Sequence, residues 1–273
     1  MPDWTSCGLP LHAAGRHPRT TSEYEKMGEA AAIADSVTGR VVSSYALTLT
    51  NLVRARTPPA PGQVRQLVVG VSEALSYLPG ASPLRGVLTE LQVVKHYLHA
   101  SENVTYLGDQ DATKTAVLEA LRCHSWLHMS CHGVQDPDDA SRSAFMLHDQ
   151  PLTLADLADL HLDETDLAYL AACQTATGDL WLLDEALHLA GALQLAGYRH
   201  VLATLWNISD AAARVMADIT YTHLLYADPD HPSPADRPWS ARAPFALHWG
   251  ITRLRQNHPD VPSLWAPYVH FGP

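Results

Sequence analysis

One stretch decides the fold: Trp126-Leu-His-Met-Ser-Cys131-His132-Gly133. As a helix it would stack His124, His128 and His132 on one face with Cys131 nearby, an arrangement that suits zinc. As a strand it would turn its even-numbered side chains to one face and its odd-numbered ones to the other. We favour the strand and predict no metal site, because no second Cys/His pair follows at ligand spacing.

A second apolar stretch also ends in a chemically reactive residue: Asp166-Leu-Ala-Tyr-Leu-Ala-Ala-Cys173. In an open parallel sheet, ligands and catalytic groups collect at the carboxyl ends of strands. About forty residues separate His132 from Cys173, which is enough for a crossover between neighbouring strands. We therefore expect the two side chains to lie side by side, with Gly133 opening a turn directly after His132.

A thiol beside an imidazole is the pair that nucleophilic cysteine catalysis needs. The imidazole takes the proton of the thiol and later protonates the leaving amine. Backbone N–H groups of Gly133 and Cys173 are the candidate donors for the oxyanion, since glycine has no Cβ to block the approach. Each residue alone also has a structural interpretation, because a cysteine at a strand end commonly packs as a small hydrophobe.

The rest of the chain alternates short apolar runs with helical patterns, which predicts an α/β fold with a mostly parallel sheet. The expected strands are 67–71, 104–107, 126–131, 166–172 and 200–206. The expected helices are 85–99, 113–123, 154–160, 184–196, 210–226 and 245–256, with Thr113, Asp184 and Asp210 at N-cap positions. A short hairpin is expected at 143–149.

Proline-rich stretches divide the chain into parts. Residues 57–62 read as a linker between an N-terminal segment, 1–56, and a catalytic core, 63–273. Residues 228–244 contain five prolines and predict a long irregular loop inside that core. We interpret the whole chain, 1–273, as one domain.

Composition limits the possible functions. Of the 273 residues, 47% are hydrophobic and only 17% charged, which favours a large buried core. The net charge of −11 disfavours nucleic-acid binding. Neither a secretory signal nor an apolar run long enough for a membrane span is visible, and four cysteines are too few for a disulfide scaffold. These features together predict a cytoplasmic protein with free thiols.

Common catalytic motifs are absent from the sequence. It contains no G-x-G-x-x-G, no phosphate-binding loop of the form G-x-x-x-x-G-K-[ST] and no G-x-S-x-G. An ordinary nucleotide enzyme or an α/β-hydrolase is therefore disfavoured.

Several motifs in unbroken order resemble the CHAT domain, a caspase-like module related to separase in the caspase clan of cysteine peptidases. The resemblance is carried by 127–133, 143–149, 170–175, 184–190 and 204–210, with further agreement at 9–15, Ser44-Tyr45 and 265–272. It implies a caspase-like three-layer α/β/α sandwich, a His132–Cys173 dyad and no cofactor. The tetratricopeptide repeats that often accompany the family are missing, which implies a regulatory protein partner in their place.

The resemblance also implies where the residue before the scissile bond binds, namely beside the strand 200–206 and the loop after it. Trp206 and Asp210 are the candidate substrate-binding residues there, although Trp206 could be plain core packing and Asp210 a helix cap. Arg199 precedes the strand and should lie at its far end, so no guanidinium is available for an acidic residue. We predict cleavage of a protein or peptide substrate after a basic or apolar residue. The alternative is a catalytically silent interaction or signalling module.

Overall fold

The structure is a computed structural model that describes residues 11–15, 36–57, 63–78, 80, 82–98, 102–134, 136, 138–162, 164–171, 173–174, 186–206, 208–225 and 239–273. Its centre is a six-stranded sheet in the order β10-β9-β7-β3-β1-β2. All pairs are parallel except β10 with β9. The strands are β1 (Gln66–Gly70), β2 (Val104–Gly108), β3 (Trp126–Ser130), β7 (Leu167–Leu170), β9 (His200–Thr204) and β10 (Tyr268–Phe271).

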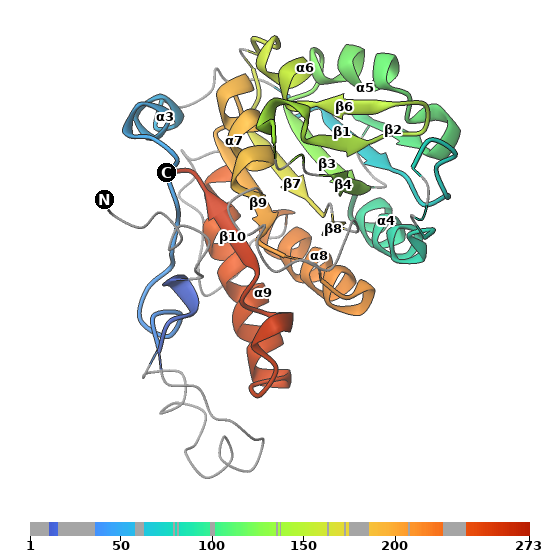
Figure 1. Ribbon diagram of the computed structural model, residues 1–273. Helices are drawn as coiled ribbons and strands as arrows, with labels where there is room; N and C mark the ends of the chain where they lie inside the picture. The colour runs from blue at the N-terminus through green and yellow to red at the C-terminus, as the bar shows by residue number, and fades with distance from the viewer. Residues whose placement is uncertain are drawn as a thin grey trace.

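Helices cover both faces of this sheet, so the molecule has three layers (Figure 1). One face carries α4 (Arg85–Leu98), α8 (Asp210–Leu225) and α9 (Ala243–Asn257); the other carries α5 (Lys114–Leu121), α6 (Leu154–Ala158) and α7 (Ala186–Ala196). Burial on both faces explains why the central strands are almost continuously apolar. The described architecture is the predicted α/β sandwich with a mostly parallel sheet.

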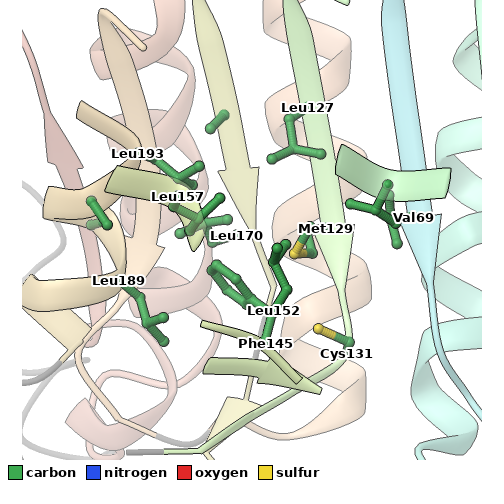
Figure 2. Close-up of a cluster of buried hydrophobic side chains, with 14 of the residues drawn as sticks. Val69, Leu127, Met129, Cys131, Phe145, Leu152, Leu157, Leu170, Leu189 and Leu193 are labelled. Carbon is green, nitrogen blue, oxygen red and sulfur yellow. The ribbon is translucent and has the colours of Figure 1, made fainter. Parts of the chain in front are cut away.

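The larger core lies between the sheet and the helices α5, α6 and α7. Alternate residues of β3 point into it, among them Leu127 and Met129, which are both almost completely buried. Phe145 and Leu152 enter the same cluster from a separate small sheet (Figure 2). The strand interpretation of the histidine-rich stretch is therefore confirmed, and the helical interpretation that suggested zinc is wrong.

The small sheet has the order β6-β5-β4-β8, formed by β4 (His132–Val134), β5 (Ala144–Met146), β6 (Pro151–Thr153) and β8 (Cys173–Gln174). Strands β5 and β6 pair antiparallel and confirm a hairpin close to the expected place. Strands β4 and β8 begin within three residues of the ends of β3 and β7. The small sheet therefore continues β3 and β7 beyond their carboxyl ends in the main sheet.

The N-terminal segment packs along β10 at the sheet edge. The Tyr45 N–H donates to His270 O at 2.8 Å, and the Gly272 N–H donates to Tyr45 O at 3.0 Å. The short helix α3 (Leu49–Ala55) follows, and the Ala55 carbonyl accepts a hydrogen bond from Arg199. Segments near the two ends of the sequence thus share one edge of the sheet.

The proline-rich stretch is only partly as expected. Residues 239–242 form a 3-10 turn and α9 begins at Ala243, so the prediction of irregular structure is wrong for the end of 228–244. Pro244 is tolerated because it stands in the first turn of the helix, where its missing N–H has no acceptor to lose. Residues 226–238, most of the linker 57–62 and Asp184 lie outside the described part of the chain.

Candidate active site

The two predicted catalytic residues are partners in one parallel ladder. Met129 of β3 pairs with Leu170 of β7, and His132 of β4 pairs with Cys173 of β8. The offset is 41 residues in both ladders, so the register of the central sheet continues without a slip into the small sheet. Residues opposite each other in a ladder have neighbouring Cα atoms, and the backbone thus brings these two positions together.

His132 is fully buried, and one ring nitrogen is already engaged. Its Nε2 lies 2.9 Å from the carbonyl oxygen of Ser82, in the segment that leads into α4. A carbonyl only accepts, so Nε2 carries the hydrogen and Nδ1 is the basic nitrogen of the neutral ring. Burial lowers the pKa of the imidazole below its usual value, and the hydrogen bond to Ser82 opposes this shift. Such a ring is neutral at pH 7 and able to accept a proton.

Gly133 occupies the middle of β4 instead of the expected turn. It pairs with Phe145 on one side and with Gln174 on the other. The turn prediction was wrong because a glycine after a strand also fits a second strand in which backbone approaches backbone closely.

A buried polar cluster lies beneath β3, on the side of α4 and α8. Glu90 accepts a hydrogen bond from Ser130 Oγ at 2.9 Å, and its other oxygen is 3.2 Å from His128 Nε2 without the alignment of a hydrogen bond. His128 Nδ1 and the Tyr221 hydroxyl are 3.1 Å apart. His128 is thus a partnered core histidine on the strand that leads to His132. His12 is equally structural: it is buried, and its Nδ1 lies 2.9 Å from the Tyr45 hydroxyl.

Trp206 and Asp210 lie beyond the carboxyl end of β9, on the same side of the sheet as the dyad positions. Trp206 follows β9, the neighbour of β7, and its indole N–H donates to Ser263 O at 3.3 Å. It packs against the buried clusters on the two faces of the sheet, one beside α7 and one beside α8 and α9, which agrees with the structural interpretation of this side chain. Arg199 lies at the opposite, amino end of β9, as the sequence predicts, and there it pairs with Asp166 at 3.0 Å.

Asp210 is the first residue of α8, and the prediction that it caps this helix is wrong. The cap is Ser209, whose hydroxyl accepts from the Ala212 N–H at 3.3 Å. The exposed Asp210 side chain lies over Gly86 of α4, where an added Cβ would come within 2.2 Å of the Asp210 Cγ. Gly86 is four residues after Ser82. This carboxylate therefore lies at the start of α4, next to the segment that contacts His132.

Two further observations concern metal ions and membranes. Within the described ranges, no group of three or more His, Cys, Asp or Glu side chains could hold a metal ion. His124, one of the residues in the zinc interpretation, lies after α5 and hydrogen-bonds with Ala120 O and Thr105 Oγ1. None of the helices that the structure describes is long and apolar enough to cross a membrane.

Comparison with known proteins agrees with this architecture. The sequence model of the CHAT domain matches residues 29–273. No curated protein matches the sequence.

Among solved structures, the complex of Porphyromonas gingivalis RgpB pro- and mature domains aligns with a TM-score of 0.53 at 14% identity, over 82% of this chain and 52% of that one. The Arg specific cysteine proteinase gingipain R (RGPB) aligns at 12% identity with a TM-score of 0.49, over 76% and 46%. Saccharomyces cerevisiae separase, in its complex with securin, gives 13% identity and a TM-score of 0.46, over 82% and 13%. The chain thus spans about half the length of the gingipain chains. The chain shares its fold with the RgpB domains, and this fold is the caspase-like α/β/α sandwich predicted from the sequence.

Proposed function

Because the chain belongs to the CHAT domain family, we propose that it is a cysteine endopeptidase in which His132 and Cys173 form the catalytic dyad. The observation that carries the proposal is their pairing in register at the prolonged end of two central strands. The buried imidazole, with its Nε2 hydrogen held by Ser82, adds support because Nδ1 is then the basic nitrogen of the neutral ring.

In the proposed reaction, His132 Nδ1 takes the proton of the Cys173 thiol while the sulfur attacks the scissile carbonyl carbon. The developing oxyanion is held by backbone N–H groups of Gly133 and Cys173. The imidazolium returns the proton to the leaving amine, and the C–N bond breaks to give a thioester. Water then hydrolyses the thioester with His132 again acting as base. The substrate is a protein or a peptide, and the chemistry requires no cofactor.

Asp210 is the proposed recognition residue for the side chain before the scissile bond. Its carboxylate is exposed next to the segment that contacts His132, and Ser209 has taken over the capping role that would have explained it otherwise. A carboxylate at this place favours lysine or arginine, while Trp206 and its apolar surroundings also suit an apolar residue. The proposal includes cytoplasmic location and a regulatory protein partner.

The pH dependence of cysteine alkylation tests the dyad. A thiol paired with an imidazole should react with iodoacetamide well below pH 8.5, the usual thiol pKa. The chain offers its own control, because neither Cys123 nor Cys131 forms a disulfide; Cys123 is exposed and Cys131 is buried. We expect Cys173 to be alkylated faster than Cys123 at pH 6 to 7, measured per site by peptide mass spectrometry, and His132→Gln to abolish the difference. Equal rates for Cys173 and Cys123 would instead support the catalytically silent interaction module.

A further inference from the structure

Asp109 is the one described residue other than glycine with a positive φ, at 41°. It directly follows β2, and its backbone conformation is one that side chains with a Cβ rarely adopt, although aspartate tolerates it better than most. Strained residues persist when the surrounding contacts determine them, and they concentrate near functional sites. The contacts of the Asp109 side chain therefore indicate which part of the structure depends on this backbone conformation.

The carboxylate of Asp109 accepts hydrogen bonds from the start of the segment between β1 and α4. Its Oδ1 accepts from the Ser72 N–H at 2.7 Å and from the Glu73 N–H at 3.1 Å. The Ser72 hydroxyl lies 3.1 Å from both carboxylate oxygens. Ser72 is itself buried, so removal of the carboxylate would leave two of its polar groups without these acceptors.

The same segment carries the acceptor for His132. The Leu84 N–H donates to Ser72 O at 2.9 Å, which closes the segment at its base. Ser82, two residues before Leu84, presents the carbonyl that receives His132 Nε2 at 2.9 Å. Hydrogen bonds thus link Asp109 to Ser72 and Ser72 to Leu84, and two residues of backbone lead from Leu84 back to the Ser82 carbonyl that contacts the imidazole.

We propose that Asp109 is a positioning residue for His132, and that it fixes the Nε2–H form of the imidazole by holding the Ser82 carbonyl in place. The proposal rests on the proposed function, in which His132 is the base. Asp109 touches no reacting atom; its effect passes through the segment that ends at α4. Asp111, exposed in the same 3-10 turn (Asp109–Asp111), supplies a matched control.

The direct test is ¹⁵N nuclear magnetic resonance of the histidine rings, with the His132 signal assigned by its loss in His132→Gln. The wild type and Asp111→Ala should show a single Nε2–H form. Asp109→Gly, which removes the carboxylate and relieves the strain, should show a mixture of both neutral forms. Asp109→Asn keeps an acceptor oxygen and should restore the single form. A folded Asp109→Gly protein that keeps the single form, or a wild type that lacks it, would overturn the proposal.

Alkylation of Cys173 gives the second readout. At pH 7 its rate should fall about tenfold to a hundredfold in Asp109→Gly, as expected for a misplaced catalytic group, and recover in Asp109→Asn. Failure of the proposed function looks different: Cys173 would be unreactive in the wild type, while the His132 ring would still respond to Asp109. If Asp109→Gly does not fold, Ser72→Ala, which removes only the hydroxyl contact, should give a smaller change of the same kind; none in either readout would contradict the proposal.

Discussion

At the scale of single residues, Asp210 and Ser209 divide two tasks at the start of α8. Ser209 caps the helix, and the neighbouring carboxylate is left exposed. If Asp210 binds a basic side chain, Asp210→Asn should lower kcat/KM about tenfold to a hundredfold for peptides with lysine or arginine before the scissile bond, which is the usual worth of a hydrogen bond to a charged group. Peptides with leucine at that place should change less than about twofold. A positional-scanning peptide library measures both.

Ser209→Ala is the control for that experiment. It removes the cap and should cost about 1 kcal/mol of stability, yet it should leave the preference between lysine and leucine as it was. Efficient cleavage after aspartate or glutamate would refute the predicted specificity. An equal loss on both peptides in Asp210→Asn would show a general effect on the site.

The residues of the site differ in how well they can be predicted from the sequence. His132 and Cys173 each stand where an apolar run ends, and this position predicts a sheet edge from the sequence alone. Ser82 contributes a backbone carbonyl, which every residue possesses, so no side-chain pattern signals it. Asp109 acts through contacts with a segment 36 residues earlier, and its only sequence sign is an aspartate after a glycine at a strand end.

At the scale of elements, periodicity predicted the central strands and the helices around them to within a few residues. It missed β10 as a strand, because four antiparallel edge residues have too short a pattern to stand out. It also missed the breaks between β3 and β4 and between β7 and β8. Strand β4 pairs with β5 of the β5–β6 hairpin, and this pairing is tertiary, so it leaves no local sign in the sequence of either strand.

The contact between α8 and α9 offers a prediction at this scale. Gly250 of α9 faces Met216 of α8, and an added Cβ would come within 2.2 Å of the Met216 sulfur. Gly250→Ala should therefore destabilise the protein by about 1–3 kcal/mol through overpacking. In a Met216→Ala background the obstacle is gone, and the same change should stabilise by up to about 1 kcal/mol, because alanine favours a helix over glycine.

Urea unfolding of the four proteins in this cycle measures the coupling between the two positions. The expected result is a change of sign in the effect of Gly250→Ala. If that substitution destabilises both backgrounds equally, the Met216 sulfur is not what keeps position 250 small.

At the scale of the whole molecule, distant parts of the sequence meet at the β10 edge through histidines. Ser44 Oγ lies 2.7 Å from His270 Nδ1, and His270 Nε2 lies 3.0 Å from His200 Nδ1. His12 holds the Tyr45 hydroxyl in the same region. This edge joins the N-terminal segment to β9 and β10. The charge state of these rings should therefore affect the free energy of unfolding.

Burial keeps these rings neutral in the folded protein. It lowers the pKa of His12 to about 4 and that of His200 to about 3, with Arg199 adding to the shift of His200. The pKa of His270 is also lowered, by burial and by the neighbouring His200. An unfolded histidine has a pKa near 6.5. Below about pH 6.5 the unfolded chain therefore binds more protons than the folded one.

The sign of the effect follows from this difference in proton binding. The unfolding free energy is highest above pH 6.5 and falls as the pH drops toward the folded-state pKa values, by up to about 1.4 kcal/mol per pH unit for each such histidine. Between pH 7 and pH 5, His12 and His200 should each cost about 2 kcal/mol of unfolding free energy. The carboxylates with lowered pKa values act only at lower pH, because their usual value is 3.8.

Replacement of one ring isolates its share of the slope. His200→Gln keeps a polar side chain toward His270 but cannot bind the proton, so the fall in unfolding free energy between pH 7 and pH 5 should be smaller by about 2 kcal/mol than in the wild type. The exposed His161 provides the comparison, and the change of slope in His200→Gln is measured against that in His161→Gln. Urea unfolding at pH 5, 6 and 7 measures both. Parallel slopes for all three proteins would mean that His200 carries the same proton in the folded and unfolded chains, and the acid sensitivity would then have to arise elsewhere than at this edge.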